Sequence, residues 1–137
     1  MEAQSYLKPT PDPTPDTAPF WEGLKDGKLL LQCCSACGGV RHYPRPVCPD
    51  CYSMDYRWTE AKQTGTVHSW TVSHHAFHPG FKPELPYVLV TVDLDAGVRM
   101  QAQFRGADVN ALALGLPVKL AFEAATADLT LPVFVPA

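Results

Sequence analysis

The sequence has little net charge and no long hydrophobic run, and both absences exclude classes of protein. Among its 137 residues, 11 Lys and Arg stand against 14 Asp and Glu, which gives a formal net charge of −3. A protein that neutralises many phosphates needs a concentrated positive surface, so we expect no broad nucleic-acid groove. No apolar run approaches the ~20 residues needed to cross a bilayer. No basic flank followed by an apolar stretch marks a signal peptide. We therefore expect a cytoplasmic protein without a membrane partner.

The usual combinations of catalytic residues are also missing. We find no clear acid–base pair and no glycine-rich loop that could cradle a phosphate. Hydrophobic residues make up 46% of the chain and charged residues 18%, which is typical of a folded globular protein. The length suits one domain, or a small module joined to a compact one. Such a protein is a poor enzyme by itself.

Cysteine is absent outside residues 33–51, and all five cysteines lie within that stretch. Four of them form two Cys-x-x-Cys pairs separated by ten residues: Cys34 with Cys37, and Cys48 with Cys51. Two such turns facing each other supply the four thiolates of a tetrahedral zinc site. Because four protein ligands leave no position for substrate, the pattern predicts a structural zinc ion that stabilises a small module. A tetrahedral sulfur site also suits iron, so a rubredoxin-like iron centre stays open.

Cys33 is the odd cysteine, and we leave it out of the predicted metal shell. Its spacing to Cys37 is Cys-x-x-x-Cys, whereas Cys34 completes the usual pair. Disulfides are disfavoured because no export signal is evident, and two adjacent pairs favour a shared metal over a redox site. Gly38 and Gly39 follow the first pair, where positive φ angles are useful.

Prolines crowd the N-terminal residues 1–19, for which we predict an extended arm. The arm is either a disordered tail or a segment laid along a partner's surface. A short helix should follow it, capped by Thr17 or Asp16, with Pro19 in the first turn and Gly27 at the end.

A β-strand over residues 29–32 should lead from this helix into the first cysteine turn. We therefore assign residues 20–60 to a unit made of the helix and a zinc ribbon.

Hydrophobic residues alternate with a period of two in much of the remaining sequence, residues 61–137. A hairpin turn is predicted at residues 95–97, and a helix at residues 106–115, with Asp108 as its cap and Gly115 as its stop. Three strands before that helix and two after it match the order of an OB-fold, a five-stranded, partly open barrel. A small sandwich is the alternative. The strands are expected at residues 66–75, 87–94, 98–104, 118–122 and 129–135.

The connection between the first two of these strands, residues 74–86, lies where OB-folds commonly place a binding loop. The predicted fold class is thus mainly β, with an N-terminal helix and a rubredoxin-like zinc ribbon followed by a five-stranded OB-fold barrel.

Several motifs together resemble one known family. The stretch "PFWEGLKDGKLLLQCCSACGGVRHYPRPVCPDC" is followed by "SWTV", "FHPGF", "PYVLVTVDLDAGVRM" and "TLPVFVPA". From Phe20 to the end, the chain resembles the acyl-CoA-associated zinc-ribbon plus OB-fold family, long catalogued as domain of unknown function 35. One departure is Cys33, where that family often has a basic residue.

The resemblance implies an accessory subunit of a thiolase-like enzyme. Members pair with lipid-transfer-protein-type thiolases and steroid side-chain aldolases, and some are fused to hydratase-like domains. The family's catalytic residues lie on the partner, while the barrel binds that partner and borders the channel for the pantetheine of CoA. We thus expect a complex that acts on an acyl-CoA thioester, by retro-aldol or thiolytic C–C cleavage of a steroid or lipid side chain. A heterotetramer with a dimeric partner is the expected assembly.

CoA chemistry needs an apolar slot for pantetheine and a few cations for phosphates. The candidate cations are Arg41, Arg45 and Lys82, together with His42, although each can equally be ordinary surface charge.

The side chains expected to line the partner's acyl-CoA entrance belong to the loop after the first barrel strand: His75, His78 and Phe81. A second metal bound by His74 and His78 is a weaker alternative, since no third ligand is evident.

Two other functions remain in view. Zinc ribbons and OB-folds often bind DNA or RNA, but the acidic balance of the chain opposes that hypothesis. Electron transfer by an iron site would give a red protein with visible absorption.

Overall fold

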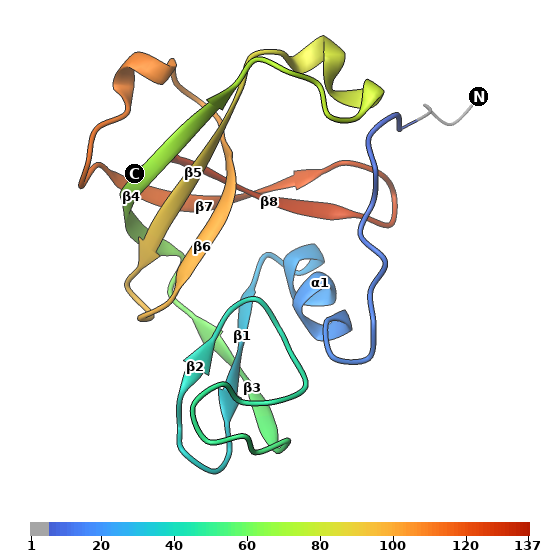
Figure 1. The fold of residues 1–137 in the computed structure, drawn as a ribbon, viewed down its shortest axis with the longest axis vertical. Helices are drawn as coiled ribbons and strands as arrows, with labels where there is room; N and C mark the ends of the chain where they lie inside the picture. Colours follow the sequence, from blue (N-terminus) through green and yellow to red (C-terminus); the bar gives the residue numbers. More distant parts are fainter. Residues whose placement is uncertain (1–5) are drawn as a thin grey trace.

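Two β units of different size, with a short helix between them, make up the computed structural model, which describes residues 6–137 (Figure 1). The smaller unit is a three-stranded sheet and the larger a closed five-stranded barrel. No helix in residues 6–137 has the length and apolar character that a bilayer crossing requires. The predicted mainly β fold class is confirmed.

The helix α1, Ala18–Lys25, begins and ends close to the predicted positions. Proline stands in its first turn, where a missing N–H costs nothing. Thr17 occupies the N-cap position, but its side chain does not cap the helix; its hydroxyl instead accepts a 2.8 Å hydrogen bond from the Thr14 N–H. Gly27 follows the helix with φ +71°.

The small sheet has the strand order β2-β1-β3, with both pairings antiparallel. β1 (Leu29–Cys34) covers the predicted strand and runs two residues further. β2 (Val40–Arg41) and β3 (Tyr56–Ala61) were not predicted. The "YRWTEA" segment is rich in β-forming residues, so β3 could have been found from its sequence.

The barrel has the strand order β4-β5-β6-β8-β7, closed by a pairing of β4 with β7. Its strands are antiparallel except for a short parallel contact between β6 and β8, where Gln103 and Phe104 face Val133 and Phe134. The predicted OB-fold order is confirmed, and Gly97 closes the predicted hairpin turn with φ +94°. The strands are β4 (Thr64–Ser73), β5 (Tyr87–Leu94), β6 (Arg99–Phe104), β7 (Pro117–Ala124) and β8 (Thr130–Pro136).

The helix predicted over residues 106–115 is wrong in extent, because only one 3-10 turn, η2 (Val109–Ala111), forms there. Asp108 caps this turn as predicted, accepting a hydrogen bond from the Asn110 N–H. The end of the segment bonds to β4 and so does not continue as a helix. The Gly115 N–H donates to the Val67 carbonyl at 2.8 Å, and the Val67 N–H donates to the Leu116 carbonyl at 3.0 Å. A second 3-10 helix, η1 (Pro79–Glu84), lies in the 74–86 loop and was not predicted.

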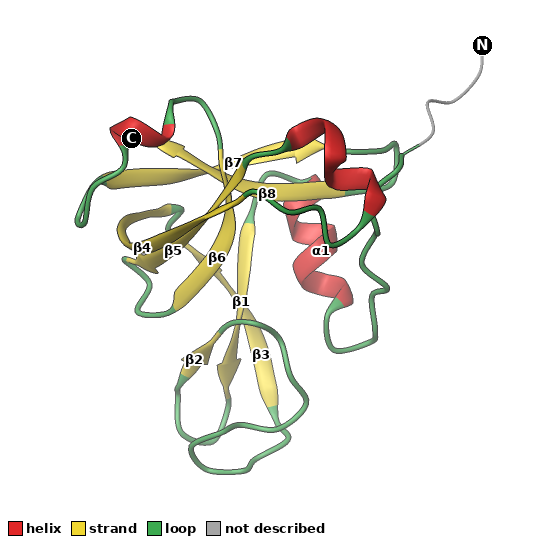
Figure 2. Ribbon diagram, turned by 45° about the horizontal axis from the view of Figure 1, so that its top comes forward, coloured by secondary structure: helices red, strands yellow, loops and turns green. Residues whose placement is uncertain are grey.

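One hydrophobic core joins the two units. Phe20 and Leu24 from α1 and Leu29 and Leu31 from β1 belong to the same cluster as the barrel interior. Figure 2 shows α1 beside the barrel strand β8, above the small sheet. Trp58 and Trp70 are half-buried and pack against this cluster. Because the core is shared, the position of the small sheet is coupled to the barrel.

The described part of the proline-rich arm lies on its own chain. It runs past the barrel to α1 (Figure 1), tied at one end by a Lys8–Glu84 ion pair and at the other by a hydrogen bond from the Tyr56 hydroxyl to Asp16. Residues 6–17 are therefore packed on their own chain and are not a free tail, whereas contact of the arm with a partner's surface stays a prediction.

Gly65 provides a test of the barrel packing. A Cβ atom at this position would lie 2.5 Å from the Asp93 carbonyl oxygen and 3.0 Å from the Leu94 Cα, both backbone atoms of β5. We expect Gly65→Ala to lower the free energy of unfolding by about 2 kcal/mol through overpacking, as measured by denaturant titration. Thr66→Ala, at the exposed neighbouring position, is the control and should change it by less than about 0.5 kcal/mol. Equal effects of the two substitutions would contradict the packing.

Candidate metal centre and partner-facing loop

The four cysteines predicted as metal ligands converge at the far end of the small sheet. Their Sγ atoms all lie within 4.8 Å of one another. Cys34 and Cys51 approach to 3.6 Å, and Cys37 and Cys48 to 3.7 Å. In a tetrahedron with zinc–sulfur bonds of about 2.3 Å, the sulfur atoms are about 3.8 Å apart. The donor set and its spacing therefore fit a tetrahedral zinc ion.

The two cysteine turns have the same backbone design. In the first, the Gly38 N–H donates to the Cys34 carbonyl at 2.9 Å, and in the second the Tyr52 N–H donates to the Cys48 carbonyl at 3.0 Å. Both turns end in a left-handed residue, with φ +76° at Gly38 and +63° at Tyr52. The glycine matches its prediction, whereas a tyrosine in this conformation was not expected. The Tyr52 ring is 78% exposed.

The backbone N–H groups of the turns favour thiolates, although hydrogen bonds among the sulfurs raise the pKa of Cys37 and Cys51. The Cys37 N–H lowers the pKa of Cys34 to about 6, and the N–H groups of Cys51 and Asp50 lower the pKa of Cys48. At Cys51 the Ser53 N–H also lowers the pKa, but hydrogen bonds with the neighbouring sulfurs, Cys34 first, raise it to about 12. A divalent cation between the sulfurs would lower the pKa of all four thiols, because it favours the deprotonated form of every ligand. The neighbouring sulfurs would then no longer keep Cys51 protonated.

Cys33 lies outside this cluster, as predicted. Its Sγ is directed to the carbonyl oxygens of Gly38, at 3.6 Å, and Cys34, at 4.0 Å. The side chain is 5% exposed, so it packs as a small apolar residue.

Arg41 is buried beneath the segment between the two cysteine turns and forms hydrogen bonds that fix this segment. Its Nε donates to Gln32 Oε1 at 2.8 Å, its Nη2 donates to the Arg45 carbonyl at 3.1 Å, and its guanidinium covers the Tyr56 ring. Arg41 is 6% exposed and Gln32 is fully buried. Gln32 Oε1 also accepts a 2.8 Å hydrogen bond from the Arg45 N–H. Of the candidate cations in the ribbon, Arg45 alone is exposed.

His42 is also turned inward, into an aromatic cluster. Its ring lies 5.2 Å from that of Phe20 and 5.6 Å from that of Tyr43. Trp21 completes the cluster, because its indole N–H donates to the Tyr43 hydroxyl at 3.0 Å. Burial lowers the pKa of His42 to about 4, so the imidazole is neutral and does not serve as a cation at pH 7.

Of the side chains in the 74–86 loop that were predicted to line a channel, two are engaged within the protein and one is exposed. His78 Nδ1 accepts a 3.0 Å hydrogen bond from the Gly80 N–H and so caps η1. Phe81 is half-buried, with its ring 5.1 Å from that of Tyr87. His75 is exposed, and its ring meets that of Phe77 edge to face at 4.7 Å. Phe77 is 83% exposed; its place at the tip of a long loop was the available signal.

The predicted cations do not form one site. Lys82 is exposed on η1, whereas Arg45 is exposed between the two cysteine turns. Figure 1 places η1 and the small sheet at opposite ends of the molecule. Within residues 6–137, the four cysteines are the only group of three or more potential metal ligands, and His74 and His78 belong to none.

Comparison with known proteins gives the family. The model of the ChsH2 rubredoxin-like zinc ribbon domain matches residues 21–57, and that of the ChsH2 C-terminal OB-fold domain matches residues 58–123. A solved structure described as an Ltp2-ChsH2(DUF35) aldolase contains a similar chain, with a TM-score of 0.82 and 40% identity. The match covers 93% of this chain and 98% of that one. The chain belongs to the ChsH2 (DUF35) family.

Two curated relatives are named as alpha subunits of CoA hydratases. A probable enoyl-CoA hydratase alpha subunit of Thermomonospora curvata is 42% identical over 96% of this chain and 40% of the relative. The 3-oxo-4,17-pregnadiene-20-carboxyl-CoA hydratase alpha subunit of Mycobacterium tuberculosis is 37% identical over 82% of this chain and 35% of the relative. The ChsH2-like chain thus spans well under half the length of both proteins.

Metal removal tests the sulfur cluster. We expect one zinc ion per chain by elemental analysis, and no visible absorption of the kind an iron–thiolate site gives. Cys48→Ser should lose the metal and unfold the small sheet, because metal binding in such modules is worth on the order of 10 kcal/mol. Cys33→Ala is the matched control and should keep the full metal content. Stoichiometric zinc in Cys48→Ser would refute the ligand set.

His42 predicts a pH dependence of stability. Its pKa falls from an ordinary value of 6.5 to about 4 on folding, so the unfolded chain binds the proton more tightly. This contribution is complete above about pH 6.5 and is lost as the pH falls towards 4. It amounts to about 3 kcal/mol.

The free energy of unfolding of His42→Phe should therefore fall less steeply over this window than that of the parent chain. Acid release of zinc is common to both proteins and cancels in the comparison. His74→Gln, at an exposed position, serves as the control and should follow the parent curve. Parallel curves for the parent and His42→Phe would show that His42 does not carry the effect.

Proposed function

We propose that this chain is a non-catalytic subunit or module that binds a thiolase-superfamily enzyme of the lipid-transfer-protein type. The complex would cleave a C–C bond in an acyl-CoA ester, with a retro-aldol step on a steroid or lipid side chain favoured over thiolysis. The acyl-CoA thioester would be the substrate of the complex, with catalytic residues on the partner. A structural zinc ion held by Cys34, Cys37, Cys48 and Cys51 would be the cofactor of this chain.

The saturated sulfur centre is the observation that carries the proposal. Four cysteines fill a tetrahedral shell and leave no position at which a metal could activate water or polarise a carbonyl. Two of the three carboxylates that line a pocket of about 590 Å³ are engaged as well, since Glu84 and Glu123 both pair with Arg105. Chemistry on a partner is the simpler account of these two observations.

The comparisons support the partner and substrate classes. The chain's likeness to part of an Ltp2-ChsH2(DUF35) aldolase favours a subunit of an aldolase complex. A steroid-like acyl group is favoured by the name of the mycobacterial relative.

Two exposed regions are our candidates for contact with the partner and CoA. His75 and Phe77 at the tip of the 74–86 loop would line the acyl-CoA entrance, with His78 and Phe81 shaping the loop behind them. Arg45 and Lys82 would contact phosphates or the partner, and Arg41 would position the segment that carries Arg45. We further propose a cytoplasmic heterotetramer built on a dimeric partner.

A nucleic-acid-binding module is the less favoured function. The net charge of the chain is −3, and the described arm covers part of the barrel face on which OB-folds often bind oligonucleotides.

Reconstitution tests the proposal. The chain should co-purify with a thiolase-superfamily enzyme of the lipid-transfer-protein type when the two are expressed together. The complex, but not the isolated chain, should turn over members of a panel of CoA esters. The double variant His75→Ala/Phe77→Ala should raise KM or weaken assembly about tenfold, because exposed aromatics often anchor interfaces. Neither side chain holds the described fold together.

Leu114→Ala is the matched control, since Leu114 is another apolar side chain, 75% exposed, on a different loop. It should leave assembly and KM unchanged. Turnover of an acyl-CoA by the isolated chain would overturn the proposal, as would tight low-salt binding of nucleic acid in place of the enzyme partner.

A further inference from the structure

The arm is fastened to the loop that carries the proposed partner-facing residues. Lys8 Nζ lies 2.5 Å from Glu84 Oε2, with exposed side-chain fractions of 14% and 26%. The same ammonium group stands 5.4 Å from the centre of the Phe81 ring. A half-buried ion pair of this kind is screened less by salt than one on an open surface.

Gly80 allows the arm to come this close. A Cβ atom added at Gly80 would collide with the backbone of Leu7 and Lys8. The glycine is buried within η1 and does not have a left-handed φ angle. Its lack of a side chain therefore serves the contact with the arm and not the local backbone conformation.

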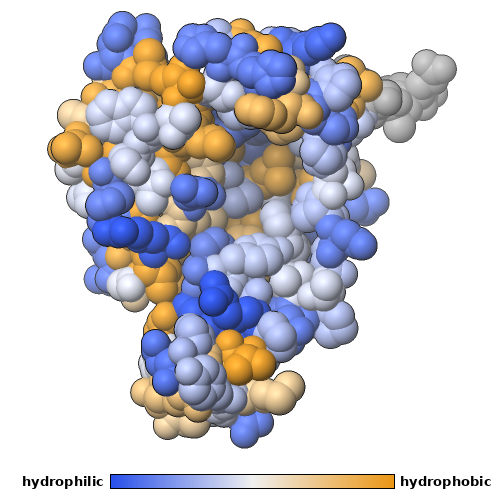
Figure 3. All heavy atoms as spheres, viewed as in Figure 1, coloured by the Kyte–Doolittle hydropathy of each residue, from blue (hydrophilic) through white to orange (hydrophobic). Residues whose placement is uncertain are grey.

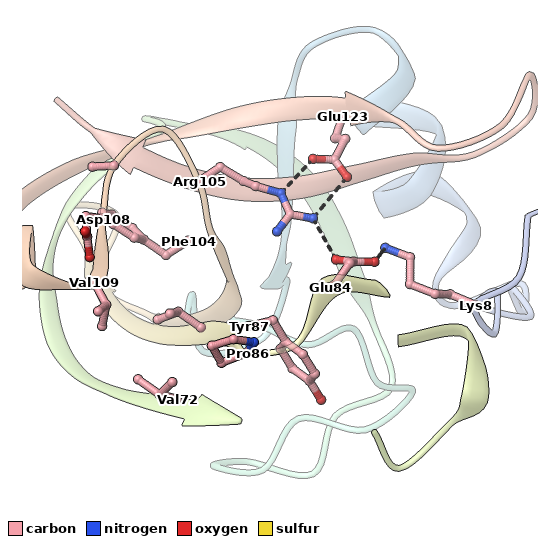
Figure 4. Close-up of a pocket in the computed structure, with 12 residues that line it drawn as sticks. Lys8, Val72, Glu84, Pro86, Tyr87, Phe104, Arg105, Asp108, Val109 and Glu123 are labelled. Carbon is pink, nitrogen blue, oxygen red and sulfur yellow. Dashed lines mark hydrogen bonds and ion pairs between the residues drawn. The ribbon is translucent and has the colours of Figure 1, made fainter. Parts of the chain in front are cut away.

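The ion pair continues into the barrel. Arg105 lies 3.3 Å from Glu84 and 3.1 Å from Glu123 (Figure 4). Although burial lowers the pKa of Arg105, the Glu123 and Glu84 carboxylates more than offset this and raise it. Lys8, Glu84, Arg105 and Glu123 thus form a charge chain that joins the arm, η1, the end of β6 and β7.

An apolar groove of about 290 Å³ runs beneath the arm and meets this charge chain at Lys8 and Glu123. Figure 3 shows the surface hollowed between η1, the arm and the barrel, with apolar side chains at the floor. An OB-fold commonly binds ligands on its second and third strands, here β5 and β6. The groove is lined by the aromatic rings of Tyr6, Trp21 and Phe81 and by side chains of β5, β6 and β8, among them Leu89, Gln101 and Val133.

We propose that residues 6–13 of the arm are a strap across the ligand face of the barrel, and that Lys8 and Gly80 are positioning residues that hold the 74–86 loop in place. The strap closes the groove from one side and fixes η1 through the ion pair and the close backbone contact. The loop tip with His75 and Phe77 is then presented in one orientation to whatever it meets. The functional part of this inference rests on the proposed role of that loop in the enzyme complex.

Hydrogen exchange on the zinc-loaded full chain tests the strap without any partner. In Lys8→Met, the Phe81 and Leu85 amides, which donate to the His78 and Lys82 carbonyls, should exchange about tenfold faster because local opening costs less. Gly80→Ala should speed the exchange of the same two amides, although its Lys8 is intact. Lys8→Arg should restore protection, and the barrel amides of Val90 and Val92 should not change in any variant. Lys28→Met, at an exposed lysine, is the matched control.

The same variants in the enzyme complex test what the strap is for. Lys8→Met and Gly80→Ala should raise KM for an acyl-CoA ester about three- to tenfold with kcat unchanged, since they misplace a binding loop and not a reacting group. If the loop amides exchange at the parent rate in both variants, the strap is overturned. If they exchange faster while KM and assembly stay unchanged, the positioning role is overturned. Failure of the parent chain to form any complex would count against the proposed function alone, because the exchange experiment does not need the partner.

Discussion

The meeting of four sulfur atoms at one point is the constraint on which the small sheet depends. β1, β2 and β3 are short, and the segments between them have little regular structure, so this end of the molecule buries few apolar side chains of its own. Cys34 stands at the end of β1, and the same strand carries Leu29 and Leu31 into the core shared with α1 and the barrel. An ion that ties the cysteine turns together thereby fixes one end of a strand whose other end is anchored by hydrophobic burial.

Polar contacts hold the parts of the chain that lie outside the hydrophobic core, which are the segment between the cysteine turns and the N-terminal arm. Gln32 and Arg41 order the segment between the cysteine turns from a buried position, and the Lys8–Glu84–Arg105–Glu123 chain connects the arm with three parts of the barrel. Within residues 6–137, Gln32 Nε2, Arg41 Nη1 and His42 Nδ1 are buried without a hydrogen-bond partner. Such groups cost free energy relative to apolar packing. The hydrogen bonds that Gln32 and Arg41 do make orient the segment between the cysteine turns, which apolar contacts alone would leave less defined.

The arrangement separates stability from recognition. The apolar core, the Arg41 side chain and two of the four sulfur ligands, Cys34 and Cys48, lie inside. The most exposed large apolar side chains stand on loops, Phe77 and Leu114 at the barrel and Tyr52 and Met54 at the cysteine turns. A rigid frame that presents exposed side chains on surface loops is a common way to build a binding protein. This separation is consistent with the proposed accessory function, in which the chain orients surfaces while bond cleavage takes place on another polypeptide.

The sequence by itself determined the four-cysteine cluster, the order of the barrel strands and the short helix, because these depend on local spacing and on alternation of apolar residues. It also indicated the position of the long loop. It did not reveal that Gly115 and Leu116 bond to β4 instead of ending a helix, nor that Arg41 and His42 turn inward while Arg45 stays in solvent. It left open where the arm lies. These outcomes were decided by the tertiary structure, since they depend on partners distant along the chain: Val67 for Gly115, Gln32 for Arg41, and Glu84 for Lys8. A local pattern records how a segment can fold, but only packing determines which distant groups satisfy its hydrogen bonds and charges.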